Sequence, residues 1–127
     1  MYTNKLTAIL AITGLVGLTP VSSLAESNKP NPPAVPFQYG LGLQNYRSMC
    51  SACHGEWGSG SDSGPPLIHV YYKPSHHSDD SFYRAALEGV TAHHWNFGDM
   101  PPVENAQAED IKPIVVFIRW LQAEYGI

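Results

Sequence analysis

The chain has 127 residues, of which 43% are hydrophobic and 14% are charged, and its formal net charge at pH 7 is −4. This length fits one domain plus a targeting segment, and the composition excludes a disordered or fibrous protein. No basic patch or run suggests nucleic-acid binding. The acidic balance instead favours a protein partner with a basic docking face.

Residues 1–25 have the order of an export signal. Lys5 is the only charged residue among them, residues 6–18 are apolar or small, and Pro20 follows. Ser23 and Ala25 then place small residues where a signal peptidase requires them, so we expect cleavage after Ala25. The apolar run is shorter than the about 20 residues that span a bilayer. We therefore expect a periplasmic protein without stable membrane insertion; an anchor formed by the uncleaved signal is the alternative.

The next segment, residues 26–36, contains four prolines and predicts a flexible, extended linker. A folded domain is expected over residues 37–127. Its first helix should run from about Gly42 to Cys53, because the apolar residues recur at helical spacing. Residues 55–66 are rich in turn formers. Residues 67–72 are apolar, but without a second strand candidate we expect them to form an extended loop.

Two more helices follow. Residues 78–87 predict a helix with Ser78 at its N-cap and Gly89 at its end, and residues 90–102 predict a loop. Residues 108–125 predict the last helix, in which Pro113 requires either a late start or a bend. The fold class is therefore all-α, with three main helices and long loops. That is too little core for such a domain, so something else should fill its middle. The apolar stripe of the last helix consists of Ile111, Ile114, Val115, Ile118 and Leu121.

The two cysteines stand in the sequence Cys50-Ser51-Ala52-Cys53-His54, a C-x-x-C-H pattern. Two thiols on one helical turn can add to the two vinyl groups of one porphyrin, and the next residue can place an imidazole on the iron. A thioredoxin-like redox pair would need a βαβ context, and a zinc site would need further soft ligands. The motif therefore predicts one covalently attached haem c on Cys50 and Cys53, with His54 as iron ligand.

Other segments join this motif in a wider pattern. They are Gly42-x-x-x-Tyr46, Cys50-x-x-Cys53-His54-Gly55, Gly64-Pro65-Pro66-Leu67, Asp99-Met100-Pro101-Pro102 and Phe117-Ile118-Arg119-Trp120-Leu121. Over roughly residues 40–125 the chain resembles a class I c-type cytochrome. The resemblance implies a monohaem fold in which the first helix crosses the last one, with Gly42 and Tyr46 set against the last helix near Trp120.

The resemblance also implies how the haem is held. The Pro65 carbonyl should accept the Nδ1 proton of His54, since such a partner orients a ligating imidazole, and Leu67 should pack on the haem. Trp95 is the aromatic residue that we expect to touch it. Other residues that could line the ring are Trp57, Tyr71, Tyr72 and Phe97, and Arg47 and Arg84 could pair with its propionates.

Met100 is the candidate for the second iron ligand. Met1 belongs to the signal and Met49 adjoins Cys50, so among the three methionines only Met100 is free to reach the distal face. A thioether ligand stabilises ferrous iron. His93 and His94, on the same loop, are the rivals and would give a bis-histidine haem of lower potential.

The chain has five further histidines besides His54. Adjacent histidines diverge on a strand or a helix, so one pair rarely chelates a metal alone. A second transition metal, such as copper, would require the two pairs to converge, and solvated surface histidines are the simpler interpretation. These residues are His69, His76, His77, His93 and His94.

These patterns favour a single-electron carrier that is not an enzyme and that shuttles electrons between periplasmic or membrane redox proteins. A haem with both axial positions filled can exchange an electron but cannot readily bind a substrate. The alternatives are an enzyme or gas sensor with an open haem position, and a metal-handling module that uses the histidine pairs.

Overall fold

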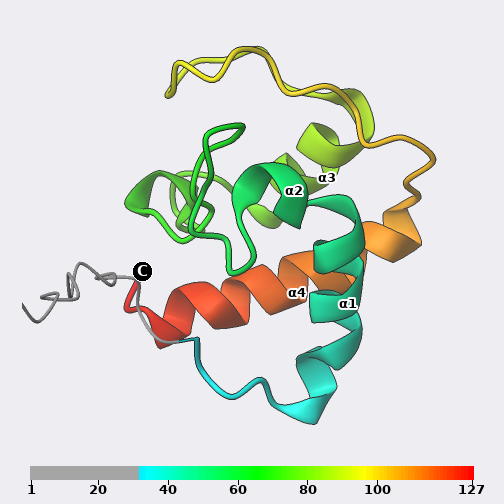
Figure 1. Ribbon diagram of the computed structural model, residues 1–127, viewed down its shortest axis with the longest axis vertical. Coiled ribbons are helices and arrows are strands. Elements are labelled where there is room, and N and C mark those ends of the chain that lie inside the picture. Colours follow the sequence, from blue (N-terminus) through cyan, green and yellow to red (C-terminus); the bar gives the residue numbers. More distant parts are fainter. Residues whose placement is uncertain (1–31) are drawn as a thin grey trace, which may run out of the picture. The chain divides into compact units, whose positions relative to one another are not determined.

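The computed structural model describes residues 32–127 (Figure 1). The expected signal (1–25) and residues 26–31 of the expected linker lie outside the described residues. The described part contains α1 (Gly40–Met49), α2 (Ser51–His54), α3 (Asp79–Glu88) and α4 (Ala108–Glu124), with 3₁₀ turns at Phe37–Tyr39 and Val70–Tyr72. Within this part the only β-pairing is two isolated bridges, so the expected all-α fold is confirmed. None of its helices is long and apolar enough to cross a membrane.

The expected first helix is divided into α1 and α2. It starts at Gly40 rather than near Gly42, because the preceding 3₁₀ turn leads into it, with the Tyr39 amide donating to the Pro36 carbonyl at 2.9 Å. The Tyr39 ring also stacks on Trp120, with centroids 4.9 Å apart. These contacts outweigh the low helix propensity of glycine. The helix is interrupted at Cys50, whose φ of −124° departs from helical geometry.

Helix α1 crosses α4 in direct backbone contact (Figure 1). A Cβ on Gly42 would lie 2.2 Å from the Pro113 carbonyl oxygen and 2.6 Å from the Phe117 Cβ. Next to this contact the Tyr46 and Phe117 rings pack with centroids 5.7 Å apart, and both side chains are fully buried. The expected crossing is therefore present. Gly42 and Tyr46 meet Pro113 and Phe117, while Tyr39 is the residue that meets Trp120.

Helix α4 starts at Ala108 and continues through Pro113, so the alternative of a late start is wrong. It ends at Glu124 with Tyr125 as its C-cap, close to the expected boundary. Its predicted apolar stripe is buried, from Ile111 to Leu121. This helix therefore supplies most of the hydrophobic core on which α1 and α3 pack.

Helix α3 and the loop after it form the other side of the domain. Ser78 occupies the N-cap position, but its hydroxyl makes no capping bond and lies 3.4 Å from that of Ser81 instead. Gly89 ends the helix at a φ of 82°, as expected from a conformation that favours glycine. In the loop, Val90 and Met100 exchange two backbone hydrogen bonds of 2.9 Å each. The expected extended loop at 67–72 instead closes with the 3₁₀ turn Val70–Tyr72.

The close contact at Gly42 predicts that alanine is far more destabilising at Gly42 than at Gly40. Gly42→Ala should lower the free energy of unfolding by about 1–3 kcal/mol, as overpacking does, because the contacted carbonyl cannot move independently. Gly40→Ala is the matched control: its Cβ would meet nothing within 4 Å and its φ is −58°. The free energy of unfolding of this control should rise by about 0.4–1 kcal/mol, because alanine reduces the conformational entropy of the unfolded chain. Urea unfolding followed by circular dichroism measures both, and equal stability of the two variants would contradict the packing argument.

Candidate functional site

A cavity of about 760 Å³ lies among α2, α3, α4 and the loop that carries Met100. Its volume is within the about 300–1,000 Å³ typical of ligand pockets. The sides of the cavity are largely apolar, which favours a hydrophobic ligand. The apolar side chains that line it include Leu67, Phe82, Ile111, Ile114 and Val115.

The cysteine motif opens into this cavity. Cys50, Cys53 and His54 all line it, and the cysteines are free thiols. Cys50 is half-buried, whereas Cys53 is exposed. Burial, and after it the charge of Cys53, raises the pKa of the Cys50 thiol to about 11. Cys50 is therefore a neutral thiol at physiological pH.

His54 is buried and held by its surroundings. Its Nδ1 lies 2.8 Å from the Pro65 carbonyl oxygen, which is the contact that the resemblance implies. With the proton on Nδ1, the lone pair of Nε2 is left for a metal. Burial lowers the pKa of His54, and the hydrogen bond to Pro65 partly offsets this. The imidazole is therefore neutral near pH 7, which is the form that ligates iron.

The backbone around His54 is fixed from the α1–α4 crossing. The Tyr46 hydroxyl donates to the Gly55 carbonyl at 2.6 Å, and the Gly60 amide donates to the His54 carbonyl at 2.8 Å. Burial, followed by the proximity of Cys50, raises the pKa of Tyr46 well above its usual range, so its hydroxyl keeps its proton. The histidine is thus oriented through both its ring and its main chain.

Other residues that we expect to contact the haem also line the cavity. Leu67, Trp95 and Met100 line the cavity with Tyr72 and Phe97. The Trp95 Nε1 donates to the Tyr72 hydroxyl at 3.1 Å. Burial raises the pKa of Tyr72, although this hydrogen bond opposes the effect. Met100 is half-buried and its backbone is anchored by the bridge to Val90.

Three of the residues that could contact the haem lie outside the cavity lining. Trp57, Tyr71 and Arg47 do not contribute to the cavity surface. The Arg47 guanidinium pairs with the Glu56 carboxylate at 2.9 Å and lies 5.3 Å from the Trp57 ring centroid, so these groups satisfy one another on the surface. Arg84 does line the cavity.

Two residues of α4 that the sequence analysis missed hold the cavity wall. The buried Gln122 amide donates to the Leu67 carbonyl at 2.8 Å and to the Tyr72 carbonyl at 3.1 Å. Arg119 donates to the Tyr72 and His77 carbonyls and to the Asp79 carboxylate at 2.5–2.7 Å. The position of Gln122 on the apolar stripe of α4 could have indicated a buried polar contact. Nothing in the sequence distinguished Arg119.

The two histidine pairs converge at the edge of the same cavity. The rings of His76, His77 and His94 lie 4.8–5.3 Å apart, centroid to centroid. The His93 ring is 4.3 Å from that of His94. Partial burial, followed by the neighbouring imidazoles, lowers the pKa of His94. His76 and His93 are exposed, as expected of surface histidines, but His77 and His94 are half-buried.

The donor set therefore fits a covalently attached haem. The thiols of Cys50 and Cys53, the imidazole of His54 and the thioether of Met100 all line one largely apolar cavity. The two thiols are the groups that can form thioether links. The imidazole and the thioether are established axial ligands of haem iron.

The comparisons with known proteins give one match. A family model described as Cytochrome c matches residues 41–122, which include the cysteine motif and Met100. No significant match was found among curated proteins or among solved structures.

In the haem-free protein, the lowered pKa of His54 predicts that the fold loses stability in acid. In the unfolded chain the imidazole binds a proton at about pH 6.5, whereas in the folded chain it does so only at lower pH. The contribution of the neutral His54 side chain to the free energy of unfolding is therefore complete above about pH 6.5. It is lost as the pH falls from there towards the pKa of His54 in the folded chain. Urea unfolding at about pH 7 and about pH 5 measures the loss. In His54→Gln the loss should be smaller; an unchanged loss would assign it to other groups.

Proposed function

The chain belongs to the cytochrome c family, and on this basis we propose that it carries single electrons between redox proteins through one covalently attached haem c. The observation that carries the proposal is that Cys50, Cys53 and His54 line one cavity while Pro65 fixes the ring of His54. A bound haem supplies the one-electron exchange between ferric and ferrous iron. The protein's part is to hold the haem, to exclude water and to set the axial ligands.

The roles of the residues follow from their places. Cys50 and Cys53 form the thioether links, and the Nε2 of His54 binds the iron because its Nδ1 is engaged by Pro65. Leu67 and Trp95, which line the cavity, contribute to the apolar surface that excludes water. A haem in the cavity that α2, α3 and α4 surround would also complete the core of the domain.

Met100 is proposed as the distal ligand. It lines the same cavity as His54, and the paired backbone hydrogen bonds with Val90 limit the movement of its main chain. With His54 and Met100 both as ligands, a bound haem iron would exchange electrons without a change of ligands. This arrangement supports electron transfer over substrate chemistry.

The covalent link is tested on the purified, exported protein. We expect an absorption spectrum that changes reversibly on reduction, pigment that stays with the protein in acid–acetone, and no carbon monoxide binding at neutral pH. Cys53→Ala should accumulate little holoprotein, because it removes one of the two attachment points. Colourless protein, or pigment released into acid–acetone, would exclude a c-type haem. Carbon monoxide binding would indicate an open iron position and favour a sensor or an enzyme.

Substitution of Met100 tests the distal ligand. Met100→His should lower the reduction potential, because replacing a thioether by an imidazole favours ferric iron. Met100→Leu should abolish the weak far-red absorption band that sulfur ligation gives to ferric haem. Met49→Leu is the matched control, since Met49 also lines the cavity, and it should keep both the band and the potential. A Met100→His potential at or above that of the parent would refute the assignment.

The partner is proposed to present a basic face to the cavity mouth. The chain carries a net charge of −4, and Glu88 and Glu104 line the cavity beside Arg84. Attraction between opposite charges accelerates encounter and is screened by salt. The rate of electron transfer to a basic redox protein should therefore fall as ionic strength rises; a rate that rises with salt would exclude such a partner.

Residues 1–25 are proposed to export the chain to the periplasm, with cleavage after Ala25. The support is the order of charge, apolar run and small residues in the sequence. The intact mass of the periplasmic protein should correspond to a chain that begins at Glu26. A mass that retains residues 1–25 would favour the uncleaved anchor.

A further inference from the structure

The two histidine pairs meet at the edge of the haem cavity, and we propose that His76, His77 and His94 bind a divalent transition-metal ion of the kind that prefers imidazole, such as Cu²⁺ or Zn²⁺. None of these residues is a ligand in the proposed haem site. The inference goes beyond the proposed electron carrier and does not depend on it.

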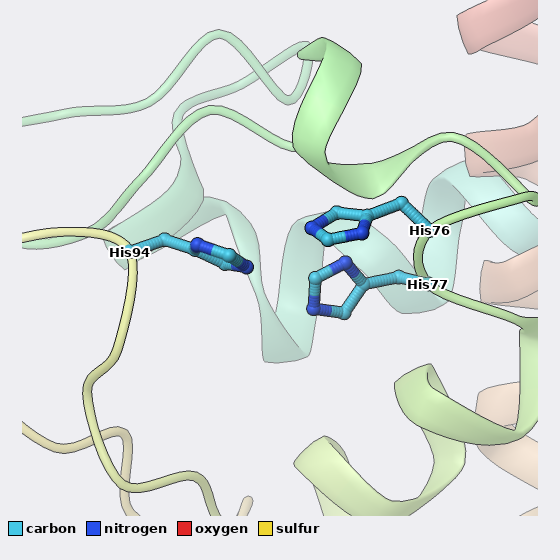
Figure 2. A group of neighbouring side chains, drawn as sticks. All are labelled: His76, His77 and His94. Atoms are coloured by element: carbon cyan, nitrogen blue, oxygen red, sulfur yellow. The ribbon is translucent and has the colours of Figure 1, made fainter.

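The geometry of the three imidazoles is close to that of a metal site. Figure 2 shows the side chains of His76 and His77 extending from one loop towards His94, which extends from another. One ligand nitrogen from each residue lies within 4.8 Å of the others. A tetrahedral ion with bonds of about 2.0–2.1 Å needs nitrogens about 3.3 Å apart. The three therefore have to close by at most about 1.5 Å, which side-chain rotation on exposed loops allows.

The convergence of adjacent histidines has a structural cause. His76 and His77 lie on neither a helix nor a strand but on a turn, in which both of their amides donate to the Lys73 carbonyl at 2.9 Å. Their rings consequently lie side by side, 4.8 Å apart with planes at 86°. This turn removes the divergence that a regular element would impose on neighbouring side chains.

The site is partly organised before any ion binds. The Nδ1 of His77 lies 2.5 Å from the Tyr71 carbonyl oxygen, which favours the proton on Nδ1 and leaves Nε2 as the ligand atom. A carbonyl on the second ring nitrogen is the usual partner of a metal-bound histidine. Arg119 also fixes the His77 carbonyl, at 2.5 Å. On the other loop the Ala92 amide donates to the Asp99 carboxylate at 2.8 Å, which steadies the backbone before His94.

The chemistry of the cluster selects the class of ion. Neutral imidazoles suit copper, zinc and nickel, whereas magnesium and calcium require oxygen ligands. The rings of His76 and His94 make no hydrogen bond to any other residue in 32–127, so their lone pairs remain available. His76 is exposed, and an ion can therefore reach the cluster from solvent. A water molecule can complete a four-coordinate site.

The test is isothermal titration of the purified holoprotein with ZnSO₄ and, separately, CuCl₂. We expect one ion per chain, and MgCl₂ should give no binding. His77→Ala and His94→Ala should each weaken the metal affinity at least about tenfold. Losing only the hydrogen-bond partner of a metal ligand already lowers metal affinity about 10–100-fold, and these variants lose a ligand itself. His69→Asn is the matched control, because His69 lies nearby but caps the turn at Val70–Tyr72 through its Nδ1. Its affinity should equal that of the parent.

Spectra and melting curves of the same variants separate this site from other roles. Each variant should keep the haem spectrum and melting temperature of the parent; His77→Gln and His94→Gln replace any alanine variant that fails to fold. Unchanged Zn²⁺ and Cu²⁺ affinity in both substituted positions would overturn the proposal. Loss of an iron-ligand band in His94→Ala would also overturn it, because that histidine would then serve the haem.

Discussion

The close contact between Gly42 of α1 and the Pro113 carbonyl of α4 is the constraint on which the remaining architecture depends. Without a side chain at this crossing, the two helices approach until Tyr46 packs on Phe117. The buried Tyr46 hydroxyl then reaches the Gly55 carbonyl, one residue after His54. The packing of α1 on α4 thereby helps to orient the His54 imidazole, because the Tyr46 hydroxyl holds the main chain just after His54.

Helix α4 supports the site in a second way. Its apolar stripe forms the core, while Gln122 and Arg119 bind carbonyls of residues 67–77, a segment whose one regular element is the 3₁₀ turn Val70–Tyr72. Backbone carbonyls at a cavity wall are costly to leave without donors. These side chains supply the donors, so one helix carries both the packing and the polar support. The same loop contains His76 and His77, which links the histidine cluster to the core.

The sequence was sufficient where local chemistry decides the outcome. The cysteine motif, the end of α3 at Gly89 and the stripe of α4 all follow from residue spacing. Long-range packing determined what could not be foreseen: the start at Gly40 depends on Tyr39 stacking on Trp120. Pairing of Arg47 with a haem propionate was possible from the sequence, but in the structure its guanidinium pairs with Glu56 and lies over Trp57. The meeting of the two histidine pairs depends on how two separate loops fold, and sequence spacing contains no information about that.

The burial of Cys50 has a consequence for the biogenesis of the protein. Thioether formation requires a reactive sulfur to reach a vinyl carbon, and the thiolate is the nucleophilic form. In the folded chain Cys50 is half-buried and its thiol pKa is raised to about 11, so it offers little thiolate. The completed fold is therefore a poor acceptor. A chain in which Cys50 is still exposed would offer more thiolate for this bond than the folded chain does.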